Sequence, residues 1–118
     1  MAGISDNAMQ SMQYAMSGLT ARAELRANNI ANAETPGFLA KQLDFESTLK
    51  AALENGDGAA SAGSAIISNR NTLPNIMGNT VELELETTEM LSDDILYQAM
   101  INGWNAKARN LRIAMGSS

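Results

Sequence analysis

Few side chains of this 118-residue sequence are of the types that carry out catalysis. It has no histidine and no cysteine, which removes the usual general base, the commonest metal ligand and any disulfide framework. The hydroxyl of Ser47 and the amines of Lys41 and Lys50 have no neighbouring base or orienting group in the sequence. A phosphate-binding glycine loop is also missing. We therefore predict that the chain is not an enzyme and binds no cofactor.

An acidic run is the strongest candidate for metal binding, because Glu82, Glu84 and Glu86 alternate with apolar residues. Calcium loops need a defined oxygen pattern around a central glycine turn, which this run lacks. A solvated or partner-facing acidic edge is the favoured interpretation, and we predict no metal site. Trp104 has the alternative of stacking on a ligand, but its spacing in an apolar pattern favours packing.

The charge and hydropathy of the sequence exclude two classes of partner. The net charge is −5, and the basic residues cluster only at Lys107, Arg109 and Arg112, so we predict no nucleic-acid binding. No stretch approaches the roughly 18 consecutive apolar residues of a membrane span. The N-terminus also lacks the basic region and apolar run of a cleaved signal peptide. We expect a chain that does not span membranes and leaves the cell, if at all, by another route.

Two long helices account for most of the apolar pattern. The first is predicted over residues 6–33, capped by Ser5 or Asp6, and the second from about Leu85 to the C-terminus. Each carries a coiled-coil seam of alternating three- and four-residue steps. The seam positions are Met9, Met12, Met16, Leu19, Ala23 and Ile30 in the first helix, and Met90, Tyr97, Ile101, Trp104, Ala108 and Leu111 in the second. The predicted fold is mainly α, an antiparallel pair of long helices joined by an irregular central segment.

The central segment is predicted to be an excursion between these helices. The chain divides into residues 1–36 and 79–118, which form one inner domain, and residues 37–78 between them. A short helix is expected over residues 45–53, and the glycine-rich tract 55–64 is expected to be a flexible loop. Ile66 and Ile67 either pair as a short strand or dock on another surface. The alternating run 81–86 is expected to be extended at first and helical by about Leu85.

The two seams predict a register for the helix pair. Facing positions have residue numbers that add up to 120, and the polar interruptions Arg26 and Asp94 then meet. We hypothesise that they form one charged layer that fixes the register. The alternatives are that both point to solvent at the edge of the seam, or that a neighbouring subunit pairs with either residue.

The stretch between residues 28 and 38 ends the first helix and carries the most specific motif. Its asparagines weaken a helix, Pro36 disfavours a helical Thr35, and Gly37 permits a turn. The motif residues are Asn28, Asn29, Asn32, Thr35, Pro36, Gly37 and Phe38. This sequence motif resembles the one near the N-terminus of bacterial flagellar axial proteins, the rod and hook family. The run 78–84, followed by Tyr97-Gln98-Ala99, is most similar to the proximal rod subunits of that family.

The resemblance implies a structural subunit of the flagellar basal-body rod that assembles in a helical array around the export channel. The implied partners are copies of itself, other rod proteins, the membrane (MS) ring with its rod-junction protein, and the flagellar type III export gate. The implied location is the basal body in the periplasmic space, after export from the cytoplasm. The alternatives are another axial rod or hook subunit, or a small helical-hairpin secreted effector or adaptor.

Two groups of residues take candidate roles from this resemblance. The asparagines of the motif are expected to contact neighbouring subunits, the alternative being that they only fray and cap the helix end. Phe45 and Leu49 are similar to a short export-gate motif of early rod and hook substrates. The same spacing also arises in any small amphipathic helix, so packing remains the alternative for this pair.

Overall fold

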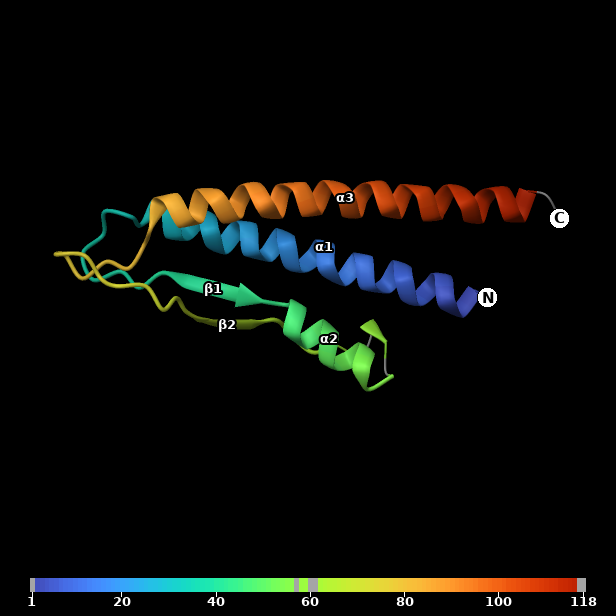
Figure 1. The fold of residues 1–118 in the computed structure, drawn as a ribbon, viewed down its shortest axis with the longest axis horizontal. Coiled ribbons are helices and arrows are strands. Elements are labelled where there is room, and N and C mark those ends of the chain that lie inside the picture. The colour runs from blue at the N-terminus through green and yellow to red at the C-terminus, as the bar shows by residue number, and fades with distance from the viewer. Residues whose placement is uncertain (1, 57, 60–61, 117–118) are drawn as a thin grey trace.

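The computed structural model of the chain describes residues 2–56, 58–59 and 62–116. Two long helices, α1 (Ala2–Ala31) and α3 (Leu83–Gly116), run side by side in opposite directions, and both chain ends lie at the same end of the pair (Figure 1). The molecule is elongated, with principal extents of 66 × 27 × 15 Å. The predicted mainly helical fold with paired N- and C-terminal helices is confirmed.

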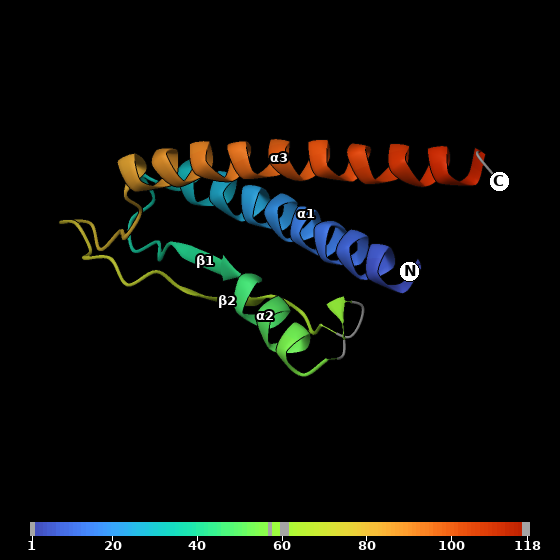
Figure 2. The same ribbon diagram turned by 45° about the vertical axis from the view of Figure 1, so that its right-hand side comes forward.

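The central segment folds back along α1. Strand β1 (Lys41–Asp44), helix α2 (Glu46–Glu54) and strand β2 (Ile66–Asn69) follow one another, and the strands pair antiparallel with Lys41 opposite Asn69. Figures 1 and 2 show α1 between α3 on one side and this hairpin with α2 on the other. Helix α1 is therefore the middle layer, which requires it to bury two faces.

Most predicted boundaries are close to the observed ones. The short helix expected over 45–53 is α2, the Ile66-Ile67 strand is β2, and α3 begins two residues before Leu85. Strand β1 was not predicted. The described residues of the tract 55–64, which follows the end of α2, contain no strand and no α-helix. Residues 57, 60 and 61 of this tract lie outside the described part of the chain.

The apolar core lies between α1 and the hairpin. Ala15 and Leu19 of α1 meet Leu43 of β1 and Phe45, whose side chain is only 2% exposed. Tyr14 packs edge-on against the Phe45 ring at a centroid distance of 6.4 Å, and the Arg22 guanidinium lies 4.7 Å from the ring centroid. Gly18 lies directly under the ring, since a Cβ built there would be 2.4 Å from Cγ of Phe45.

This arrangement corrects the predicted seam. Leu19 is buried, whereas Ala23, Ile30 and Met90 are exposed. The physical reason is that α1 turns its most buried face toward β1 and Phe45, so α3 covers only part of the remaining stripe. Met9, Met12, Met16, Tyr97, Ile101, Trp104, Ala108 and Leu111 are half-buried.

The register also differs from the predicted one at Met12. Its Sδ would be 3.3 Å from a Cβ built on Gly103, more than one helical turn before the predicted partner Ala108. A hairpin of two ideal seams is therefore too simple a description of this helix pair.

Asp44 caps α2 from the end of β1. Its carboxylate accepts hydrogen bonds from the Ser47 hydroxyl (2.6 Å) and the Ser47 backbone N–H (2.9 Å), which hold the pKa of Asp44 below its usual value. A carboxyl whose pKa is lower in the folded state contributes stability above its unfolded pKa and loses it as the pH falls through the folded value.

Replacing this cap gives a pH-dependent prediction. Asp44→Ala should lower the free energy of unfolding by about 1 kcal/mol near neutral pH, as loss of a helix cap does. The difference from the parent protein should shrink as the pH falls through the lowered pKa of Asp44, because the parent then loses its charged cap. Urea unfolding at neutral and at acidic pH measures it, with the exposed Asp94→Ala as the control, and a pH-independent difference would contradict the capping role.

Candidate functional site

The motif that ends α1 and the run that begins α3 interlock into one structure. The backbone N–H of Gly37 donates to the Met77 carbonyl (2.8 Å), and the N–H of Thr80 donates to the Phe38 carbonyl (3.0 Å). The side-chain amide of Asn79 donates to two carbonyls of the turn, those of Asn32 and Thr35, at 2.8 Å each. We call residues 32–40 and 75–81 together the junction.

The junction is closely packed despite its polar composition. Asn79 and Thr80 are 1% and 6% exposed, and the Thr80 hydroxyl accepts a hydrogen bond from the Ala40 N–H (2.7 Å). Gly37 and Gly78 have φ of 73° and 76°, in the left-handed region that favours glycine. A Cβ built on Gly78 would be 3.6 Å from Cα of Gly37, so the two turns lie in contact. The two most specific stretches of the sequence therefore form one structural unit.

Asn79 is the side chain that holds the junction together, because its amide also accepts from the Val81 N–H (2.7 Å). Asn79→Ala removes these bonds and leaves three partly buried backbone groups without this partner, each at a cost of up to about 1–3 kcal/mol. We expect faster amide hydrogen exchange in residues 32–40 and 75–81 and little change at the far ends of α1 and α3. Glu34→Ala, which changes an exposed residue of the same junction, is the comparison that shows whether the effect belongs to the buried amide.

The motif asparagines do not share one environment. Asn29 is 1% exposed, and its side chain bonds both the N–H and the carbonyl of Lys41 and the carboxylate of Glu86. The expectation that Asn29 contacts a neighbouring subunit is therefore wrong, because it lies on the face of α1 that β1 covers.

The other motif residues are more accessible. Asn28, Thr35, Pro36 and Gly37 are exposed, whereas Asn32 and Phe38 are half-buried. Asn32 donates to the Asn28 carbonyl (2.8 Å) and accepts from the Thr35 hydroxyl (3.1 Å), which closes the end of α1. Subunit contact by the exposed positions stays a prediction.

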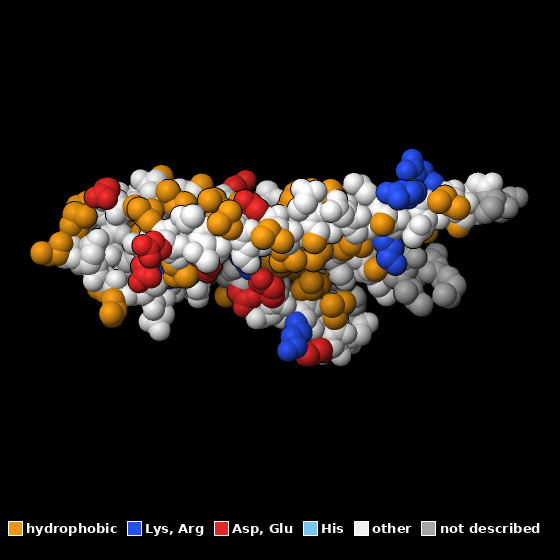
Figure 3. Space-filling model, turned by 45° about the horizontal axis from the view of Figure 1, so that its top comes forward, with side chains coloured by type: hydrophobic (Ala, Val, Ile, Leu, Met, Phe, Trp, Pro, Cys, Tyr) orange, Lys and Arg blue, Asp and Glu red, His pale blue; other side chains and the backbone are white. Residues whose placement is uncertain are grey.

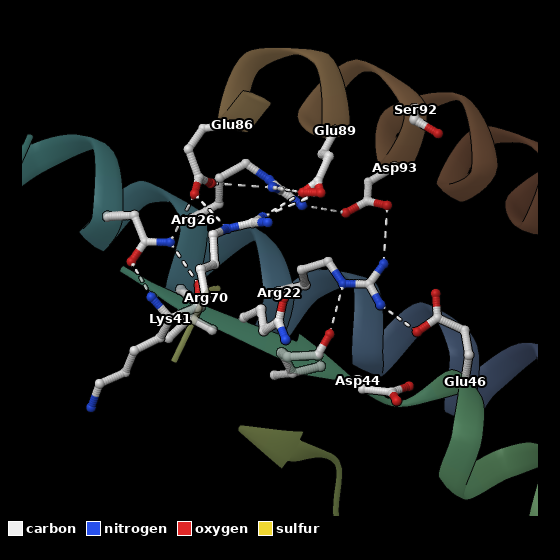
Figure 4. A pocket seen from close by; sticks show the side chains of 14 residues that line it. Arg22, Arg26, Lys41, Asp44, Glu46, Arg70, Glu86, Glu89, Ser92 and Asp93 are labelled. Atoms are coloured by element: carbon white, nitrogen blue, oxygen red, sulfur yellow. Dashed lines mark hydrogen bonds and ion pairs between the residues drawn. The ribbon is translucent and has the colours of Figure 1, made fainter. Parts of the chain in front are cut away.

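Beside the junction lies a network of ion pairs, the arginine cluster (Figure 4). It joins α1, the hairpin and α3 through three basic and four acidic side chains. The members are Arg22, Arg26, Arg70, Glu46, Glu86, Glu89 and Asp93. Every buried side-chain nitrogen and oxygen in the described part of the chain has a hydrogen-bond partner. The arginine cluster is therefore a fully paired network that stabilises the packing of these elements.

Glu86 is the centre of the arginine cluster. Its side chain is 0% exposed and accepts from Arg70 (2.9 Å), Arg26 (3.3 Å) and Asn29 (3.1 Å). The expectation of a solvated acidic edge is wrong for Glu86 but agrees with the exposure of Glu82 and Glu84. Because Glu86 points inward, the three carboxylates do not converge, and no three His, Cys, Asp or Glu side chains of the described residues are grouped so that they could hold a metal ion.

The predicted register pair is also wrong. Arg26 bonds Asp93 (2.8 Å), Glu86 and Glu89, whereas Asp94 is exposed and forms no ion pair with it in the described structure. One residue corresponds to about 100° around a helix, so Asp93 and Asp94 point in different directions, and the observed orientation of α3 turns Asp93 toward Arg26. The idea of a charged layer is retained, but its acidic partners differ.

Burial and neighbouring charges shift the pKa values of Arg22 and Arg70 in opposite directions. Burial alone would lower the pKa of Arg22, but the hydrogen bond and charge of Glu46, with the charge of Asp93, raise it above its usual value. The pKa of Arg70 is raised in the same way, against burial, by Glu89 and Glu86. Both guanidinium groups are therefore fixed positive charges that hold the hairpin to the helices.

Sequence reasoning missed Arg70, Asn79 and the inward face of α3. One signal was present: Arg22, Arg26 and Asn29 follow helical spacing in α1, as Glu86, Glu89 and Asp93 do in α3. Two polar stripes of opposite charge on paired helices predict a polar contact. Arg70 has no such pattern, because it reaches the cluster only through the pairing of β2 with β1.

The candidate export pair is split between two environments. Phe45 is buried against α1, and Leu49 is half-buried on α2. In the folded chain Phe45 therefore serves packing, and an export role stays a prediction. In the part of the chain that the structure describes, no helix combines the length and apolar character that crossing a membrane requires.

Comparison with known proteins tests the resemblance. No protein-family model matches the chain. The chain is similar to the flagellar basal body rod protein FlgB of Aeromonas hydrophila, with 32% identity over 123 aligned positions covering 93% of each chain. The chain belongs to the FlgB family of flagellar basal body rod proteins.

Other FlgB proteins show the same similarity. The FlgB protein of Yersinia enterocolitica is 30% identical, and the alignment covers 79% of this chain and 82% of the relative. The FlgB protein of Escherichia coli K12 is 26% identical, and the alignment covers 90% of this chain and 91% of the relative. FlgB family membership confirms the resemblance to flagellar rod proteins and assigns the chain to the flagellar basal body. The relatives are named as flagellar basal body rod proteins.

Proposed function

We propose that the chain is a structural subunit of the proximal rod, assembled in a helical array around the export channel, and that it connects the membrane ring to the drive shaft. The observation that carries the proposal is the match to FlgB rod proteins over 93% of the chain. The 66 Å length and the exposed apolar side chains along α3, among them Leu91 and Ile95, support a role in lateral packing.

The proposed partners follow from this role. They are copies of the chain, other rod proteins, the membrane (MS) ring and its rod-junction protein, and the flagellar type III export gate during passage to the periplasmic side. The junction supports contact with neighbouring subunits, since its hydrogen-bonded backbone carries the exposed Thr35 and Pro36 and lies next to the exposed Asn28. A helical-hairpin effector or adaptor is less well supported, because nothing in that role explains the match to rod proteins along the chain.

A deletion strain tests the proposed function. Cells without this chain should lack rods in isolated basal bodies and should not swim, and a plasmid copy should restore both. Electron cryomicroscopy of the restored basal bodies should contain density for the paired helices around the channel. Normal rods in the deletion strain would refute the proposal.

The export role proposed for Phe45 needs a separate measurement, because Phe45→Ala also removes core packing. Exported and cytoplasmic amounts should be measured together with stability, and Leu25→Ala, which alters a residue packed on the same core, serves as the matched control. A role in export predicts that Phe45→Ala lowers export more than Leu25→Ala does at equal loss of stability. Equal export would assign Phe45 to packing alone.

A further inference from the structure

An apolar groove lies between α1 and α3 on the side that the hairpin leaves open. Its volume is about 530 Å³, and its walls are formed by Leu19, Ala23, Ala27 and Ile30 of α1 and Met90 and Tyr97 of α3. Ile30 and Met90 are 36% and 39% exposed. The small side chains at 23, 27 and 31 recur every fourth residue, which leaves a channel of the shape that the ridge of another helix fills.

Two acidic side chains matter for the charge of this groove. Asp94 of α3 lines it. Glu24 of α1 is not a lining residue, but helical spacing places it next to the groove, one turn after the lining residue Thr20. Both are exposed, and neither forms an ion pair within the described residues. This differs from Asp93, whose charge is already neutralised by Arg22 and Arg26. The groove therefore presents uncompensated negative charge around an apolar floor.

The complementary surface is on the same chain. Near the end of α3, Arg109 and Arg112 are exposed and have no ion-pair partner in the described structure. Helical spacing places both on one face with Ala106 and Ile113, so this face combines positive charge with apolar side chains. Figure 3 shows Lys and Arg side chains gathered near the C-terminal end of α3, whereas most Asp and Glu side chains lie toward the other end.

We infer that the groove receives the C-terminal part of α3 of a second copy, with Arg109 and Arg112 of that copy facing Glu24 and Asp94. This inference rests on the proposed rod assembly and names the surfaces that pair within it. The groove and the basic face are different surfaces, so the contact is heterologous and continues from copy to copy instead of closing as a dimer. Asp94 and Arg109 are 15 positions apart, so parallel neighbours are displaced by about 22 Å along the helix axis.

Cysteine cross-linking in assembled basal bodies tests this contact, and the chain has no cysteine of its own. A chain with Ala27→Cys and Ala106→Cys should give a ladder of dimers, trimers and larger species on oxidation. Either single variant should give no dimers. Dimers from Ala27→Cys alone would overturn the inference, because they indicate symmetric pairing of two grooves.

Another occupant is tested by the same method. The loop between β2 and α3, residues 70–82, carries Leu73 and Ile76 at its tip, which are 88% and 103% exposed, so Ala27→Cys is also combined with Ile76→Cys. A ladder from that pair and none from the first would assign the groove to the loop tip. Intact rods in which neither double-cysteine variant forms cross-links would overturn the inference while leaving the proposed function in place.

Charge reversal provides an independent measurement in the same basal bodies. Glu24→Lys with Asp94→Lys should lower the cross-linking yield about tenfold, because like charges then face each other across the contact. Adding Arg109→Glu and Arg112→Glu to the same chain should restore the cross-linking yield to within about threefold of that without charge changes. Opposite charges then face each other again, with their signs exchanged. Failure of the fourfold variant to recover, with unchanged circular dichroism, would contradict the pairing.

Discussion

Glu86→Gln should be among the most destabilising single substitutions in this protein. The change keeps the shape of the side chain but removes the charge that Arg26 and Arg70 share at a site that is 0% exposed. Removing one partner of a buried ion pair costs about 3–5 kcal/mol. The lower end of that range is expected here, because Glu89 and Asp93 still pair with the arginines. Urea unfolding followed by circular dichroism measures the difference.

Glu84→Gln is the matched control for this prediction. It makes the same chemical change two residues away on the same helix, at an exposed position with no ion pair in the described structure. Exposed substitutions of this kind change stability by no more than about 0.5 kcal/mol. Equal losses for the two variants would contradict a special role for the buried carboxylate and would point to a general effect of charge on α3.

The arrangement of the long helices could be predicted from the sequence because it follows from local rules. Apolar periodicity over a long run of residues identifies helices reliably, and the turn motif marks where α1 ends. The rotation of each long helix about its own axis could not be predicted from the apolar periodicity of the sequence. The hairpin competes with α3 for the apolar stripe of α1, and this competition moves Ala23, Ile30 and Met90 to the surface.

The candidate site was predictable in outline and not in its contacts. The turn at Pro36-Gly37 and the return at Gly78 are visible as glycine and proline signals, and the structure brings them together. The buried amides of Asn29 and Asn79 look like ordinary loop or helix-end residues in the sequence. Their burial depends on carbonyls supplied by segments 12 to 47 residues away, which no local pattern encodes.

The second large effect is expected at a glycine. Gly18→Ala places a methyl group where Cγ and Cδ1 of Phe45 would be 2.4 Å away. The Phe45 ring cannot simply move, because Tyr14 and Arg22 pack against it. Overpacking a core costs about 1–3 kcal/mol or more, which outweighs the gain of about 1 kcal/mol that alanine brings to a helix. We expect a less stable protein in which β1 and β2 detach from α1, measured as faster amide exchange in both strands.

Gly103→Ala supplies the contrast that isolates this effect. Gly103 is also a helical glycine, and a methyl group added there would have the flexible Sδ of Met12 as its nearest neighbour, at 3.3 Å. Met12 can yield by a few tenths of an ångström, so the helix propensity of alanine should dominate and stabilise the protein by up to about 1 kcal/mol. Opposite signs for the two variants would show that Gly18 is required by the close approach of the Phe45 ring. Stabilisation by both would mean that the hairpin does not rest on α1 in solution.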